Sequence, residues 1–353
     1  MKKLFKLISL TLVAISAIVL LTACPLFADI DPADTIYVPD VELLSASDDS
    51  DASEGNENAD EDGIRDIEAG IVPLTRAPAI PNVIMPEASG RLVEKNNKMA
   101  IDHSNTDDGY IMVRWLANTT KQLRVQVTGP SDTTYTYTIH PDEMFEVFPL
   151  SDGNGSYSVN VFEQVEGSRY ALAGGIKLRV TLVDEFAPFL RPNQFVNFHE
   201  ESDVVMKAAE LVSGDYGFLE KIAAVYEFVV NHLSYDRDFA NEVIAGHHRG
   251  YLPDLDRVLA RGRGICFDYA ALMTAMLRSQ SIPTKLVIGY AGDVKHAWIN
   301  VFSEETGWID QLIFFDGENW LMMDPTFASG ASSPEALEQF IGDGSMYTET
   351  HLY

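Results

Sequence analysis

The spacing of apolar residues changes once along this chain, near residue 186, and that change divides the sequence into two folding units. Between about 98 and 183, short runs of β-branched and aromatic residues alternate with polar ones, which is the pattern of β-strands. Beyond 186, apolar residues recur at three- and four-residue intervals that are typical of helices, before strand-like runs return. We therefore expect a β domain at 96–185 followed by an α+β domain at 186–353.

Turn residues separate the strand-like runs of the first unit. Strands are expected at 109–117, 121–129, 133–140, 144–150, 156–165 and 174–183. Their regular spacing predicts an all-β sandwich of the immunoglobulin or fibronectin-III kind. No catalytic set of residues stands out in it, so we interpret it as a spacer or a binding module.

The second unit combines helices with a short sheet. Helices are expected at 201–214, 217–235 and 252–264 and from Cys266 onward, and strand-like or apolar segments at 284–292, 296–303, 308–315 and 319–327. The helix that starts at Cys266 is predicted to be amphipathic and to pack on an antiparallel sheet.

The first residues have the layout of a secretory signal, in which three lysines precede an uncharged apolar run at 7–21. The run ends in "LTAC" (21–24), which resembles a bacterial lipobox. This resemblance implies a signal peptide at 1–23, lipidation of Cys24 and anchoring to the bacterial membrane, outside the cytoplasm. Cleavage by an ordinary signal peptidase and a retained membrane anchor are the alternatives.

Residues 24–95 are predicted to form a disordered tether. The segment 29–90 carries 16 acidic and 2 basic residues, which contribute half of the net charge of −28. Such a composition cannot bury enough apolar surface to fold, and its prolines favour extended chain. The charge also argues against binding to nucleic acid and against a polybasic contact with lipid, because both need clustered Lys and Arg.

One stretch of the tether imitates a calcium-binding loop without completing it. Asn58, Asp60 and Asp62 match the first ligands of such a loop, but Ala69 stands where a bidentate Glu is required. We predict no calcium there, and no metal site or cofactor elsewhere in the chain.

Cys266 is the residue that most suggests chemistry. The only other cysteine is Cys24, so no intramolecular disulfide is predicted, a pattern that favours a reactive thiol in an exported protein. Gly262 and Gly264 lead into the helix, and the unpaired N–H groups and dipole of a helix start stabilise an anion. A thiolate in such a position has its pKa lowered from about 8.5 to about 3.5–7.5. The alternative is a buried cysteine with a packing role.

Two further residues complete a possible triad. His296 enters a strand 30 residues after Cys266, close enough in sequence to return to the helix start. A Cys–His pair forms the thiolate–imidazolium nucleophile that attacks amides. Asp324 ends a strand before Pro325 and supplies a carboxylate that could orient the imidazole, or else a simple turn residue.

Together, "GICFDYAALMTAMLRSQSIPTKLVIGY", "HAWINV" and "WLMMDPTF" resemble the transglutaminase-like superfamily, which shares the Cys–His–Asp order of papain-like peptidases. The resemblance covers about 186–353. It implies a core in which the Cys-bearing helix packs on an antiparallel sheet, with Cys266 as nucleophile, His296 as base and Asp324 as the third member. The connection from His296 to Asp324 is long and is interpreted as an inserted hairpin turning at Asp316 and Gly317, which leaves Asp310 and Asp316 as rivals of Asp324.

Neighbouring residues receive plainer interpretations. Asp268, in the first helical turn, is expected to favour the helix dipole, with support of the catalytic residues from behind as the alternative. Trp298 and Trp320 are expected to pack around the histidine and aspartate strands. His247 and His248 adjoin each other in a Gly-bounded loop and are expected to be solvated.

The resemblance implies a cysteine-dependent enzyme of acyl transfer at the cell surface. Its partners would be a protein or peptide substrate, such as a cell-wall or surface protein, and the membrane through the lipid. Hydrolysis by a peptidase or amidase is favoured over cross-linking, because cross-linking needs a second binding site. Alternatives are a protein-cross-linking transglutaminase and a non-catalytic binding or surface-assembly module that keeps the fold.

Overall fold

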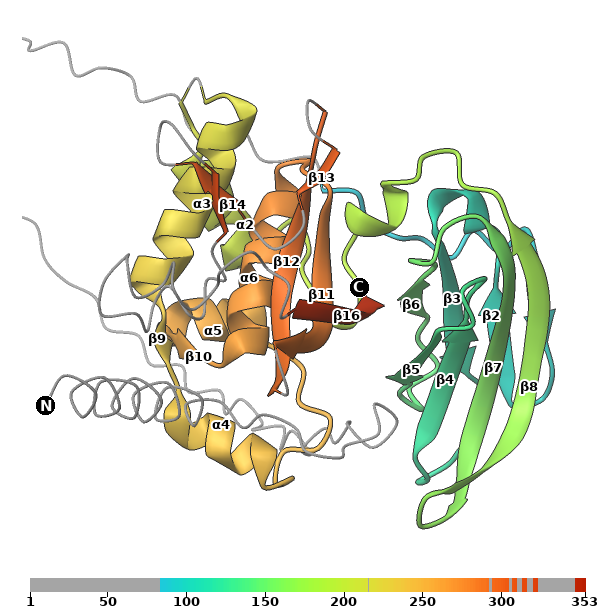
Figure 1. Cartoon of the computed structure of the whole chain (residues 1–353). Helices are drawn as coiled ribbons and strands as arrows, with labels where there is room; N and C mark the ends of the chain where they lie inside the picture. The colour runs from blue at the N-terminus through green and yellow to red at the C-terminus, as the bar shows by residue number, and fades with distance from the viewer. Residues whose placement is uncertain are drawn as a thin grey trace, which may run out of the picture.

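The computed structural model describes residues 83–214, 216–291, 294–304, 307–309, 313–315, 320–322 and 347–353. Figure 1 shows a β-rich unit, blue to green, beside a unit of helices and strands, yellow to red. The predicted signal peptide, Cys24, the tether up to residue 82 and the calcium-like stretch lie outside the described residues. No helix within the described ranges is long and apolar enough to cross a membrane.

The β-rich unit is a sandwich, as the sequence predicts. Its strands are β1 (Val93–Lys95), β2 (Met99–Asp102), β3 (Tyr110–Trp115), β4 (Leu123–Thr128), β5 (Thr134–Thr138), β6 (Glu146–Pro149), β7 (Gly155–Glu166) and β8 (Arg169–Val180). They form two sheets, in the orders β1-β2-β3-β6 and β5-β4-β7-β8, with every neighbouring pair antiparallel. Alternate side chains such as Val125 and Val127 are buried, which explains the period of two in the sequence.

The structure differs from the sequence prediction at the start of this unit. Strand β1 lies in the segment that the sequence assigns to the tether, and it pairs with β2. All three side chains of β1 are exposed, and all four of β2 are buried. Neither strand therefore carries the apolar alternation by which a strand is recognised in a sequence.

The second unit has the predicted α+β composition. Its helical segments are η3 (Ala187–Phe189), α2 (Asp203–Leu211), α3 (Phe218–His232), α4 (Arg237–Ile244), α5 (Leu255–Arg261) and α6 (Cys266–Ser279). Its strands are β9 (Ser234–Tyr235), β10 (Arg263–Gly264), β11 (Thr284–Ala291), β12 (Val294–Ser303), β13 (Gly307–Ile309), β14 (Ile313–Phe315), β15 (Trp320–Met322) and β16 (Tyr347–Leu352). The main sheet has the antiparallel order β13-β12-β11-β16, and β14 pairs with β15 on either side of the predicted hairpin turn.

Helix α6 is the centre of this unit. It contacts β11 and β12 on one side and α2, α3 and α5 on others, as Figure 1 also shows. Every one of its residues is buried, so the prediction of an amphipathic helix is wrong. Small residues such as Ala270, Ala271 and Ala275 let neighbouring elements approach it closely from several directions.

Strand β16 brings the two units together. It is the edge strand of the main sheet, where it pairs with β11, and it lies on the side of the sandwich (Figure 1). The ring of His351 meets that of Tyr135 edge-on at 5.2 Å between centroids, and its Nε2 lies 3.3 Å from the carbonyl oxygen of Thr134. The edge strand β5 of the sandwich is therefore in direct contact with the α+β unit.

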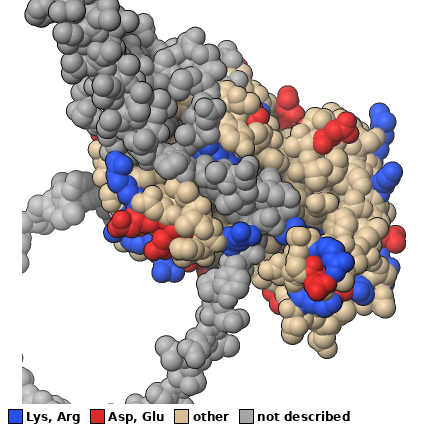
Figure 2. All heavy atoms as spheres, turned by 60° about the horizontal axis from the view of Figure 1, so that its bottom comes forward, with Lys and Arg blue, Asp and Glu red and all other residues tan. Residues whose placement is uncertain are grey.

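Charged side chains do not gather into a surface of one sign on the face shown in Figure 2. There, Lys and Arg lie among Asp and Glu in mixed clusters.

Candidate active site

The chain places Cys266 at a sharply defined helix start. Helix α5 ends at Arg261 and is capped by Gly262, whose φ of 62° is the left-handed conformation that glycine adopts readily. The two-residue strand β10 follows, and Ile265 is extended, with φ −99° and ψ 176°, before α6 begins at Cys266. Cys266 therefore occupies the first helical position, where N–H groups and the helix dipole favour negative charge.

Asp268 fixes this helix start. Its carboxylate accepts a hydrogen bond from the Ile265 N–H at 2.7 Å and another from the Tyr251 hydroxyl at 2.5 Å. Tyr251 belongs to the connection between α4 and α5, so Asp268 joins that loop to the nucleophile helix. These two hydrogen bonds add to the dipole interaction expected from the sequence.

Asp268 is completely buried, and its titration is expected to appear in the stability of the protein. Burial raises its pKa from 3.8 to about 6, while the hydrogen bonds from Tyr251 and Ile265 act in the opposite direction. Folding thus favours the protonated acid. Its stabilising effect is complete below about pH 4 and is lost as the pH rises through about 6.

We therefore expect the stability of the wild type relative to Asp268→Asn to fall by about 2–3 kcal/mol between pH 4 and pH 7. Urea unfolding at several pH values measures this difference. Asp238→Asn is the matched control, since that side chain is exposed. Parallel pH profiles for the wild type and Asp268→Asn would contradict the assignment.

Gly264 is required by the position of Asp268. A Cβ at residue 264 would lie 2.5 Å from the Cβ of Asp268 and 2.8 Å from its Oδ2. Gly264→Ala is expected to displace the carboxylate from the Ile265 N–H and to cost about 1–3 kcal/mol of unfolding free energy. Denaturant unfolding tests this, with Gly217→Ala as control, because a Cβ there comes no closer than 3.6 Å to Glu220. Equal effects of the two substitutions would refute the steric argument.

His296 lies in β12, opposite Gly289 of β11. The ring of Trp298 stacks beside the imidazole at 6.4 Å between centroids, and Tyr347 of β16 meets Trp298 edge-on at 5.1 Å. The absence of a side chain at Gly289 makes room for Trp298, whose Cη2 lies 2.4 Å from where a Cβ would stand. Trp298, which lies in the same strand, therefore packs beside His296.

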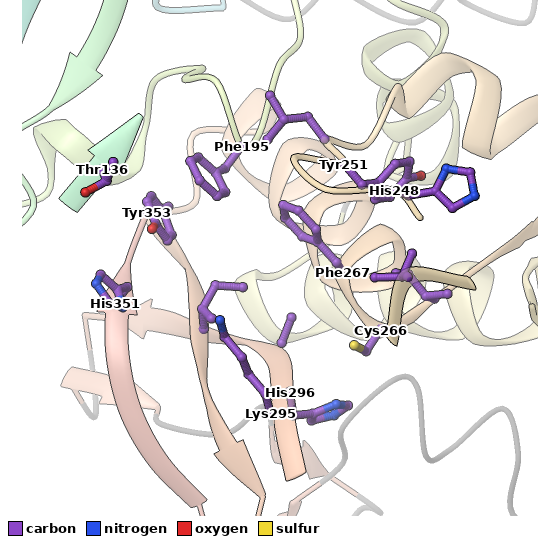
Figure 3. A pocket seen from close by; sticks show the side chains of 15 residues that line it. Thr136, Phe195, His248, Tyr251, Cys266, Phe267, Lys295, His296, His351 and Tyr353 are labelled. Carbon is purple, nitrogen blue, oxygen red and sulfur yellow. The ribbon is translucent and has the colours of Figure 1, made fainter. Parts of the chain in front are cut away.

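Cys266 and His296 line one pocket. Figure 3 shows the Cys266 side chain extending from the start of α6 toward β12, which carries His296. Their exposed fractions are 0% and 2%, so both groups are shielded from bulk water. Asp324 and its rivals Asp310 and Asp316 lie outside the described residues.

Several pocket residues could not be found from the sequence. Phe195, Tyr251 and Tyr353 line the pocket, together with Thr136 from the sandwich. None of them lies in a motif with Cys266 or His296, and the chain brings them together only through tertiary packing.

The two adjacent histidines of the α4–α5 loop have different environments. His247 is exposed, as the sequence predicts. His248, in contrast, lines the pocket, and its Nε2 lies 2.6 Å from Glu242 Oε2. Within the described residues, no group of three or more His, Cys, Asp or Glu is arranged to hold a metal ion.

Comparisons with known proteins give matches among solved structures and to one family model. Among solved structures, a candidate cysteine protease from Cytophaga hutchinsonii is 16% identical to this chain, with a TM-score of 0.31. The match covers 67% of this chain and 80% of the protease chain. The periplasmic domain of TgpA from Pseudomonas aeruginosa is 17% identical, with a TM-score of 0.31. That match covers 72% of this chain and 80% of the TgpA chain. Red sea bream transglutaminase is 11% identical, with a TM-score of 0.23. The match covers 62% of this chain and 53% of the transglutaminase chain.

No curated protein matches the chain. The family model of the transglutaminase-like superfamily matches residues 206–325, a range that contains both Cys266 and His296. Residues 206–325, within the α+β unit of this protein, therefore match a transglutaminase-like domain.

Proposed function

We propose that this protein is a cysteine-dependent peptidase or amidase that acts outside the cytoplasm. The observation that carries the proposal is the position of Cys266 at the start of α6 in the same water-shielded pocket as His296. A thiol at a helix N-terminus beside an imidazole is the arrangement that generates a thiolate nucleophile.

The proposed reaction proceeds through a thioester. The Cys266 thiolate, whose proton is held by His296, attacks the carbonyl carbon of a substrate amide. The C–N bond then breaks as His296 gives its proton to the departing nitrogen. Water attacks the thioester, His296 takes a proton from it, and the products are a carboxylic acid and the restored thiolate–imidazolium pair.

Other groups are assigned supporting roles in this proposal. The backbone N–H of Cys266, at the positive end of the α6 dipole, is the proposed donor to the oxyanion of the tetrahedral intermediate. Asp324 is the proposed carboxylate that orients the His296 imidazole. Hydrolysis is favoured over cross-linking because water needs no second binding site.

The test is incubation of the protein with cell-surface peptides and cell-wall stem peptides, followed by mass spectrometry, with Cys266→Ala as control. We expect products in which an amide has been replaced by a carboxylic acid and an amine, and none with Cys266→Ala. Joined peptides with loss of ammonia would instead identify a cross-linking enzyme. If the peptides stay unchanged and Cys266 reacts no faster than glutathione, the protein is instead a non-catalytic binding module that keeps the fold.

The proposed location is the outer side of the bacterial membrane, with Cys24 lipidated and residues 24–82 acting as a spacer. The lysine-rich start, the apolar run and "LTAC" support this proposal. Incorporation of labelled palmitate that disappears in Cys24→Ala is the expected result. Incorporation that is absent from the wild type would overturn it.

A further inference from the structure

The pocket of Cys266 is built by both units of the protein. In Figure 3, Cys266 and His296 lie on one side of it, and Thr136, His351 and Tyr353 lie on the other. Thr136 belongs to β5, the sandwich strand that contacts β16. The sandwich therefore forms part of the wall of the pocket.

A row of aromatic rings connects the nucleophile helix with the sandwich. Phe267, the residue after Cys266, lies 5.8 Å from Phe195 between ring centroids. Phe195 stacks on Tyr353 at 3.9 Å with an angle of 14° between planes, and Tyr353 meets Tyr137 of the sandwich edge-on at 6.0 Å. Because each ring packs on the next, the position of the sandwich wall is fixed relative to the thiol.

The chemistry of this wall selects against charged groups. Among the described residues that line the pocket, none is Asp or Glu. Burial lowers the pKa of His351, an effect to which the positive charge of Lys295 adds, so that the imidazole is neutral at pH 7. A basic substrate side chain would meet no counter-ion among these residues. An acidic one would find Lys295 in the pocket but would lose its hydration among the aromatic rings of Phe195 and Tyr353. An apolar side chain gains from the same surroundings.

We propose that Thr136, Phe195 and Tyr353 form a subsite for an apolar side chain of the substrate, next to the amide attacked by Cys266. This inference rests on the proposed function. It makes the sandwich a specificity-determining part of the enzyme.

The experiment uses the full chain and an unbiased peptide mixture, with the cleaved bonds identified by mass spectrometry. We expect Leu, Phe, Met or Tyr to be enriched about tenfold or more over charged residues at one position beside the cut. Thr136→Glu, which places a carboxylate in the wall, is expected to reduce this preference about tenfold. Phe195→Ala is expected to widen the subsite and to weaken the preference among apolar side chains.

Thr128→Glu is the matched control, since Thr128 lies on the neighbouring strand β4 and does not line the pocket. It should keep the wild-type preference.

Cleavage without apolar enrichment, or a preference for acidic or basic residues, would overturn the subsite while leaving the proposed hydrolysis intact. So would an apolar preference that is the same in the wild type, Thr136→Glu and Phe195→Ala. Absence of cleavage by the wild type would overturn the proposed hydrolysis, and the subsite with it.

Discussion

His296→Gln and Cys266→Ser are each expected to lower kcat/KM for amide hydrolysis by about 10³-fold or more. His296→Gln removes the group that accepts the thiol proton and later protonates the leaving nitrogen. Cys266→Ser replaces the thiolate with a hydroxyl that ionises far less readily at neutral pH. Both residues lie in one pocket, and neither substitution changes side-chain volume greatly.

The double variant distinguishes a catalytic pair from two independent residues. Groups that act as a unit give strongly non-additive losses, so the double variant should be about as slow as the slower single variant. Steady-state kinetics on a peptide substrate measures the three rates. His247→Gln is the matched control, because His247 is exposed and does not line the pocket. Losses that multiply in the double variant would argue against a shared catalytic step.

Arg278→Leu is expected to produce the largest loss of stability. The guanidinium is buried and donates to three backbone carbonyls: Nε to Thr284 at 2.9 Å, Nη1 to Arg191 at 2.7 Å and Nη2 to Tyr353 at 2.6 Å. These bonds tie the last turn of α6 to the start of β11, to the segment after η3 and to the residue after β16. Burial lowers the pKa of Arg278 to about 9, so the group stays charged at pH 7.

Removal of this side chain takes one donor from each of three backbone oxygens, of which that of Tyr353 keeps the Leu286 N–H at 3.0 Å. It also relieves the cost of a buried charge. We expect a net loss of about 3–5 kcal/mol, because each buried carbonyl that is left without a donor costs about 1–3 kcal/mol. Urea unfolding of the full chain measures it, and Arg249→Leu, at an exposed position, is the control. A loss below about 1 kcal/mol would show that water replaces the guanidinium at little cost.

The parts of the fold that local sequence patterns specify were predictable. The sandwich strands alternate because one face is buried, and the helix at Cys266 begins where glycines and an extended residue allow it. The placement of Trp298 beside His296 follows from their spacing of two along one strand.

Other parts depend on contacts that no local pattern encodes. Strand β16, with the sequence YTETHL, carries no apolar alternation and pairs only because β11 offers a free edge to it. Helix α6 is enclosed on all sides, which its sequence alone does not distinguish from an amphipathic helix. Thr136 and Tyr353 line one pocket although they are far apart in sequence, so only the tertiary structure brings them together.

The pH dependence of Cys266 alkylation by iodoacetamide tests the central claim most directly. A thiol with an ordinary pKa of about 8.5 is only about 0.3% ionised at pH 6. If Cys266 and His296 form the thiolate–imidazolium pair, the wild type should react at pH 6 about tenfold or more faster than glutathione, and His296→Gln should lose that advantage. A wild-type rate equal to that of glutathione, unchanged in His296→Gln, would contradict the account.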